Sequence, residues 1–251
     1  MNRAKYRNIL EQRIDRPSNL AQVNPEKNEI LIYEEIGFWG VTAGDFSEAL
    51  KATDPNERLT VGLNSPGGDI FDGVAIMNTL VGRGNVEIRI DGFAASIASI
   101  IAMAGDRILM AENAAFMIHN PWTVVGGDAE SLRKEAEVLD KLKTTLIKSY
   151  QRHVTTTESE LSRLMDEETW FTADEAKDVG FVTEIINSVE SSSIAQNRFD
   201  LSLYRNVPET FRKKQRQSKT NSGGEDAESL RRYHFQLRHR TNMARSRTYE
   251  D

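Results

Sequence analysis

The sequence predicts an α/β domain with a largely parallel sheet, and three features support this prediction. Strand-turn-helix units are centred on residues 30–50, 59–81 and 86–104, and such repeats favour parallel strands with right-handed crossovers. The chain has 251 residues, which is enough for one sizeable domain with extensions. Hydrophobic residues make up 39% of the chain and charged residues 28%, a balance typical of soluble globular proteins.

The first two units show the periodicities of strands and helices. In the first unit, residues 30–33 predict a strand, and Asp45 is suited to cap the helix that follows. In the second unit, residues 59–63 predict a strand and residues 64–68 a turn. A helix should then run over residues 70–80, because apolar side chains recur there at helical spacing, namely Phe71, Val74, Met77 and Leu80.

The third unit holds the most apolar part of the chain. Residues 86–91 alternate as a strand does, and Gly92 is expected to end that strand. The small and apolar residues 94–104 form a run too long and too rich in alanine for a second strand, so they predict a buried helix. The same run is too short to span a bilayer.

Further strands are predicted at residues 107–110, 115–118 and 181–186. Residues 129–153 predict a long amphipathic helix with an apolar stripe of Leu132, Ala136, Leu139, Leu142, Leu146 and Tyr150. Two capping-box patterns open short helices, at residues 157–160 and 172–175.

Composition divides the chain into an N-terminal arm at residues 1–27, a main domain at residues 28–189, and a polar, basic tail at residues 190–251 that is expected to be flexible. Residues 211–251 hold eleven Lys or Arg and five Asp or Glu, a charge of +6, whereas the whole chain carries −6. This asymmetry would suit an acidic partner or nucleic acid. Basic and aromatic residues are not interleaved there, so we expect a solvated tail and no nucleic-acid binding.

The sequence also excludes several kinds of site. It contains no cysteine, and therefore no disulfide, no thiolate nucleophile and no cysteine metal site. Its charged start lacks the apolar core of a secretory signal. We expect a cytoplasmic protein that needs neither a membrane, nor a metal, nor a cofactor.

Ser96 is a candidate nucleophile. It should lie in the first turn of the predicted helix, where unpaired backbone amides and the helix dipole would stabilise a developing oxyanion. The alternative is that Ser96 only caps this helix, which is a common task for a serine at that place.

A glycine turn would supply a second anion donor. Pro66 fixes its own backbone angle, while Gly67 and Gly68 allow a path that points amide hydrogens into a cleft. The alternative is an ordinary turn between a strand and a helix.

His119 is a candidate general base, because it follows an apolar strand and Pro121 ends regular structure soon after it. A single histidine beside apolar residues can equally be a satisfied core group. The remaining histidines lie near a helix end or in the polar tail, namely His153, His234 and His239. A serine, a histidine and two free amides are together the parts of a serine hydrolase.

The ordered motifs Asn-Ser-Pro-Gly-Gly at 64–68, Gly-Phe-Ala-Ala-Ser at 92–96 and Met-Ile-His-Asn-Pro at 117–121 resemble the proteolytic subunit of the Clp protease family. They resemble more closely its bacteriophage relatives, the head maturation (prohead) proteases. The resemblance covers residues 28–187, and the phage likeness rests on four segments, at 35–42, 97–105, 119–122 and 168–176.

This resemblance implies a catalytic set: Ser96 as nucleophile, His119 as base, Glu168 as the acid of the triad, and the amides of Gly68 and Ile97 as the oxyanion hole. Many relatives have Asp at the acid position, so the longer Glu168 is a departure from the pattern. Asp166 or Glu167 could take its place.

The resemblance also implies a spiral of ββα units shared with the crotonases, with residues 129–153 as a projecting handle helix. In the family, this handle stacks one homo-oligomeric ring on another; here, the helix could instead pack on its own domain. Protein or peptide substrates, capsid or scaffold proteins and an AAA+ unfoldase are the implied partners.

Several functions follow from these observations. The leading one is a serine endopeptidase that cuts scaffold and capsid precursors. A housekeeping Clp subunit working with an unfolding ATPase is the first alternative. A crotonase-like acyl-CoA enzyme would reuse the paired amides without needing the serine and the histidine, and an inactive ring component would need neither.

Overall fold

The computed structural model describes residues 21–187, 199 and 201–209. Its strands are β1 (Ala21–Asn24), β2 (Glu29–Ile32), β3 (Leu59–Ser65), β4 (Val86–Ala95), β5 (Arg107–Ala111), β6 (Ala115–Ile118), β7 (Thr169–Phe171) and β8 (Glu184–Ile186). Its α-helices are α2 (Ala43–Leu50), α3 (Ile70–Arg83), α4 (Ile97–Ala102), α5 (Ala129–Tyr150), α6 (Glu158–Asp166) and α7 (Ala173–Val179). Two 3-10 helices are η1 (Pro25–Lys27) and η2 (Leu201–Leu203).

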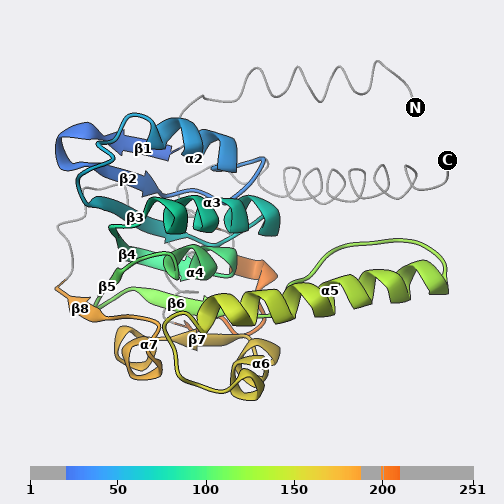
Figure 1. Cartoon of the computed structure of the whole chain (residues 1–251). Helices are drawn as coiled ribbons and strands as arrows, with labels where there is room; N and C mark the ends of the chain where they lie inside the picture. Colours follow the sequence, from blue (N-terminus) through green and yellow to red (C-terminus); the bar gives the residue numbers. More distant parts are fainter. Residues whose placement is uncertain (1–20, 188–198, 200, 210–251) are drawn as a thin grey trace, which may run out of the picture.

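The strands form one sheet in the order β1-β2-β3-β4-β5-β8, and the pairs from β2 to β8 are parallel (Figure 1). Strand β4 forks: residues 87–90 pair with β5, and residues 93–95 pair with β6. Strands β1 and β7 join antiparallel to β2 and β6. The predicted α/β fold with a largely parallel sheet is confirmed.

Strand β4 is longer than the sequence predicts, because it continues through Gly92 to Ala95. The register between β3 and β4 shifts beyond Leu63, and there the Asn64 side chain accepts a hydrogen bond from the Phe93 amide. A Cβ atom at Gly92 would lie 2.6 Å from Asn64 Oδ1. Gly92 therefore leaves room for the Asn64 side chain and does not end the strand. Helix α4 begins only at Ile97.

Other predicted boundaries also need correction. Thr42 caps α2, and Asp45 is the third helical residue of its capping box. Strand β1 lies inside the predicted arm 1–27, so the sheet begins before residue 28. Residues 201–209 pack on the domain although they fall in the predicted tail. The basic segment 211–251 lies outside the described residues.

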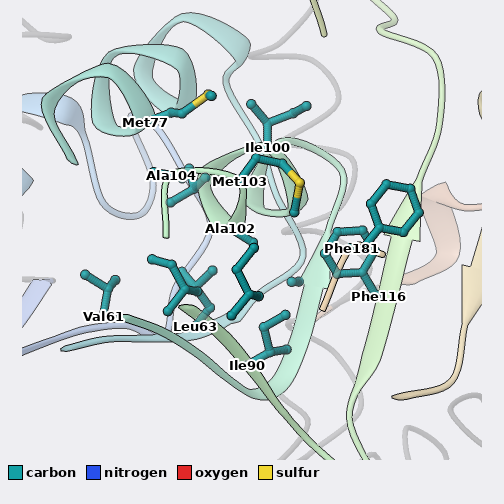
Figure 2. Packing of buried hydrophobic residues seen from close by; sticks show 14 of the residues in the cluster. Val61, Leu63, Met77, Ile90, Ile100, Ala102, Met103, Ala104, Phe116 and Phe181 are labelled. Atoms are coloured by element: carbon teal, nitrogen blue, oxygen red, sulfur yellow. The ribbon is translucent and has the colours of Figure 1, made fainter. Parts of the chain in front are cut away.

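The core lies between the sheet and helices α3 and α4 (Figure 2). Of the apolar face predicted for residues 70–80, Met77 and Leu80 are buried and Val74 is partly buried, but the prediction is wrong for Phe71, which is 65% exposed. The buried side chains that Figure 2 labels are Val61, Leu63 and Ile90 from the strands, Met77 from α3, Ile100, Ala102, Met103 and Ala104 from α4 and its end, and Phe116 and Phe181.

Helix α5 projects from the body of the molecule (Figure 1). Only its last part is anchored: Leu146 and Tyr150 are buried, and the Tyr150 hydroxyl lies 2.7 Å from Ser99 Oγ of α4. Near its start, Leu132 is 42% exposed and Ala136 is also exposed, while Leu139 and Leu142 are partly buried. Its own domain thus covers the predicted apolar stripe only in part along the projecting section. Within the described residues, no helix combines the length and the apolar character that a membrane span requires.

Helices α3 and α4 approach closely at Gly73, where a Cβ atom would lie 2.2 Å from Ile97 Cγ1. We expect Gly73→Ala to lower the free energy of unfolding by about 1–3 kcal/mol, because Ile97 would have to move within a filled core. Urea unfolding measures this. Gly82 of the same helix is the control, since a Cβ there meets nothing within 4 Å, so Gly82→Ala should not destabilise. Equal losses in both variants would contradict the prediction.

Candidate active site

Ser96 stands at the corner between β4 and α4 with φ 56° and ψ −128°. A side chain at positive φ costs on the order of 1–3 kcal/mol and persists only where neighbours fix it. Here the Ser96 amide donates to the Met117 carbonyl at 3.0 Å, and the Ser96 carbonyl accepts from the Ser99 amide. Ser96 occupies the N-cap position of α4, but its side chain makes no capping hydrogen bond. Its hydroxyl is turned to another partner.

That partner is His119, which directly follows β6. Because β6 runs parallel to the end of β4, with Ala95 opposite Met117, both strands deliver their next residues to the same edge of the sheet. Ser96 Oγ and His119 Nε2 lie 2.7 Å apart, which is a hydrogen-bond distance. The structure therefore brings together two candidates that are 23 residues apart in the chain.

The glycine turn packs directly against Ser96. A Cβ atom on Gly67 would lie 2.6 Å from Ser96 Cβ and 3.1 Å from the Ile97 nitrogen, and Gly67 has φ +95°. Only glycine combines this backbone angle with so close an approach. The turn thus lies beside both the candidate hydroxyl and the first amide of α4.

Two hydrogen bonds hold this turn to the loop after β2. The Ile36 amide donates to the Gly67 carbonyl, and the Asp69 amide donates to the Ile36 carbonyl. These bonds do not use the Gly68 amide. The Ile97 amide belongs to the first turn of α4, where backbone amides have no partner within the helix. The two predicted oxyanion donors, the amides of Gly68 and Ile97, are therefore not used by these backbone hydrogen bonds.

Two of the three candidate acids are exposed and bound to other partners. The Asp166 side chain is 55% exposed and accepts hydrogen bonds from Asn120 Nδ2 and Lys143 Nζ. Glu167 forms an ion pair with Arg163 on the surface of α6. Neither carboxylate is directed at His119 by these contacts.

Glu168 differs from its neighbours because it is buried, with 4% of its surface exposed. It has φ +49° between α6 and β7, and its charge raises the pKa of His119. Within the described residues, no hydrogen bond joins Glu168 to His119. Its Oε1 accepts instead from the Asn206 amide at 2.7 Å, and its Oε2 lies 3.9 Å from Arg205 Nε.

Burial lowers the pKa of His119 from 6.5 to about 4. The Glu168 carboxylate opposes this by raising the pKa, and the Arg205 guanidinium lowers it further. The imidazole is therefore neutral at pH 7, and a neutral imidazole can accept a proton from Ser96.

Sequence reasoning missed the residues 204–206, which contact the site although they fall in the predicted tail. Tyr204 lies edge-on to the His119 ring at 5.4 Å between ring centroids. One signal could have revealed this segment: apolar or aromatic residues recur every third position at Leu201, Tyr204 and Val207. The described residues contain no group of three or more His, Cys, Asp or Glu side chains arranged to hold a metal ion.

The opposing charges around His119 can be tested by histidine ring NMR. We expect the His119 imidazole to titrate below 6.5, with Arg205→Ala raising its pKa and Glu168→Gln lowering it. Because its pKa is lower in the folded chain, His119 favours folding above pH 6.5, and this contribution is lost as the pH falls towards 4.

His153 provides the internal reference for this titration, because burial lowers its pKa too but neither Arg205 nor Glu168 contributes to that shift. Its pKa should not change in either variant. An unchanged His119 pKa in both variants would contradict the proposed electrostatic coupling.

Comparison with known proteins places this chain in a family. The family model described as Clp protease matches residues 44–189. The chain is 32% identical over 158 residues to the ATP-dependent Clp protease proteolytic subunit 3 of Streptomyces coelicolor, which covers 61% of this chain and 72% of the relative. It is 33% identical over 144 residues to proteolytic subunit 3 of Rhodococcus jostii, covering 55% and 70%. It is 31% identical over 144 residues to proteolytic subunit 2 of Corynebacterium glutamicum, covering 56% and 72%. The chain belongs to the Clp protease family.

Proposed function

We propose that this chain is a serine endopeptidase in which Ser96 is the nucleophile and His119 the general base. The observation that carries the proposal is the 2.7 Å distance between Ser96 Oγ and His119 Nε2. The lowered pKa of His119 supports it, because the base must be unprotonated to accept the serine proton. Membership of a protease family supports the same reaction.

In this mechanism, Ser96 Oγ attacks a peptide carbonyl while its proton moves to His119 Nε2. The amides of Gly68 and Ile97 then donate to the oxyanion that forms. His119 returns the proton to the leaving amine, and water releases the acyl group by the same steps. Glu168 is the proposed third member, since its buried negative charge stabilises the imidazolium formed during each transfer.

We further propose that the chain works as a homo-oligomeric ring. The relatives bear the name proteolytic subunit, and helix α5 carries exposed apolar side chains, Leu132 and Val138, along its projecting part. Exposed apolar side chains on a projecting helix favour burial against a second copy. This would let α5 act as the handle through which two rings stack.

The proposed substrates are phage scaffold and capsid precursors. The four phage-like segments contribute to the candidate site: residues 35–42 bind the glycine turn, residues 97–105 contain α4, and residues 119–122 and 168–176 carry His119 and Glu168. The alternative is a housekeeping subunit fed by an AAA+ unfoldase, which the names of the relatives as ATP-dependent proteases favour. A crotonase-like enzyme would not require the Ser96 and His119 contact, and an inactive ring component would not use it.

A fluorophosphonate probe distinguishes these classes, because it reacts with an activated serine. We expect the protein to be labelled, Ser96→Ala to abolish labelling, and His119→Ala to slow it by at least ~10³-fold through loss of the base. Ser47→Ala is the control and should be labelled as the unchanged protein is, since Ser47 is exposed on α2. Labelling that survives Ser96→Ala would overturn the proposed nucleophile.

The substrate class can be tested by incubating the protein with a phage capsid precursor and sequencing the fragments by mass spectrometry. Cleavage at defined sites without ATP, absent with Ser96→Ala, is expected for a head maturation protease. Degradation only of an unfolded protein, and only with an AAA+ unfoldase and ATP, would support the housekeeping alternative instead. Equal fragments from both forms of the protein would contradict any role for Ser96.

A further inference from the structure

The segment 201–209, here called the strap, crosses the candidate active site. Two of its side chains anchor it in a small apolar cluster: Leu201 and Val207 are buried there with Phe93 and Ala115. Phe93 lies on β4 and Ala115 on β6, the two strands that deliver Ser96 and His119. The strap is therefore fixed to the strands that position the catalytic candidates.

Between these anchors, Tyr204 reaches the candidate base and the glycine turn together. Its ring lies edge-on to the His119 ring at 5.4 Å and to the Trp170 ring at 5.8 Å between centroids. Its hydroxyl donates a hydrogen bond to the Pro66 carbonyl of the turn. Tyr204 thus connects the side of the site that carries His119 with the side formed by the glycine turn.

The next two residues engage the acidic side of the site. The Asn206 amide donates to Glu168 Oε1 at 2.7 Å, and its side-chain nitrogen donates to the Glu167 carbonyl at 2.6 Å. Arg205 Nε lies 3.9 Å from Glu168 Oε2, a contact that water weakens because the Arg205 side chain is 75% exposed. The backbone of the strap therefore holds the carboxylate that would otherwise be available to His119.

A peptide substrate needs the same space. To place its carbonyl between Ser96 and the two amides, the chain of a substrate has to pass over His119 and beside the glycine turn. Tyr204 lies beside the His119 ring and is hydrogen-bonded to the Pro66 carbonyl of the glycine turn, so it would stand in the path of such a chain. Leu201 and Val207 fill the apolar cluster next to it.

We propose that the strap is an inhibitory segment of the chain that competes with peptide substrates for the active site. This inference rests on the proposed protease function. When the strap is seated, substrate is excluded and Glu168 is held by Asn206; when it leaves, the site opens and the carboxylate is released. Apparent substrate affinity is then proportional to the fraction of molecules in which the strap has left the site.

The test uses the full chain with the strap loosened. Leu201→Asp combined with Val207→Asp places two carboxylates where apolar side chains are buried, which should expel the strap. The matched control is Leu203→Asp, the same change at a strap position that is 58% exposed. Tyr204→Ala is a milder second release variant, and circular dichroism with thermal unfolding verifies that each variant folds.

The measured quantity is the rate at which the fluorophosphonate probe labels Ser96. Release variants should be labelled at least ~10-fold faster than the unchanged protein, equivalent to ~1.4 kcal/mol, and Leu203→Asp should be labelled at the unchanged rate. A synthetic peptide with the sequence of residues 199–209 should slow labelling of a release variant competitively. The same peptide with Asp at the positions of Leu201 and Val207 should not.

The outcomes separate this proposal from the function on which it rests. Folded release variants that are labelled at the unchanged rate, or more slowly, would overturn the strap proposal and leave the protease function intact. Slower labelling would mean that the strap completes the site. If neither the unchanged protein nor any release variant is labelled at Ser96, the protease function falls and the inhibitory role falls with it.

Discussion

The parallel pairing of the last residues of β4 with β6 is the interaction on which the candidate site depends. It sets Ala95 opposite Met117, and the Ser96 amide continues the pairing by donating to the Met117 carbonyl. His119, which carries the imidazole, is the first residue after β6 and lies two positions beyond Met117. Because β4 forks, its earlier residues remain bound to β5 and the sheet stays continuous while its end turns towards β6. Nucleophile and base are thus positioned by backbone hydrogen bonds, which hold their positions more firmly than side-chain contacts on loops would.

Close backbone packing is the second constraint on the site. The glycine turn lies against Ser96 with no room for a Cβ at Gly67, and α3 lies against Ile97 with no room for one at Gly73. Both contacts lie at the corner where Ser96 has a positive φ angle. The surrounding structure therefore supplies the energy that keeps this corner in an unfavourable backbone conformation. The absence of side chains at two glycines is what lets the corner and its two flanking amides come together.

The electrostatics of the site arise from burial and from two opposing charges. Burial keeps His119 neutral, Glu168 favours its protonated form, and Arg205 disfavours it. Glu168 is itself buried, so water screens its charge only weakly. This charge therefore acts on the His119 imidazole even without a hydrogen bond between the two groups. The seated strap adds the opposing cation and takes up one carboxylate oxygen. The protonation of His119 would therefore respond to movement of the strap as well as to pH.

The sequence determined the class of the fold and the identity of the candidate catalytic groups. Local periodicity and capping patterns are enough to place most strands and helices, since they depend on residues close in the chain. Short elements escaped this reasoning, such as β1 and the three-residue β7, because so few residues carry no periodic signal.

Only the tertiary structure decided how these parts meet. The extension of β4 through Gly92 depends on the side chain of Asn64 from another strand. The buried Glu168 is held by the amide of Asn206, which lies 38 residues further along the chain. The docking of residues 201–209 on the site depends on an apolar cluster with Phe93 of β4 and Ala115 of β6, which are far from this segment in the chain. Contacts between segments far apart in the chain leave no pattern within either segment, and for that reason local sequence does not reveal them.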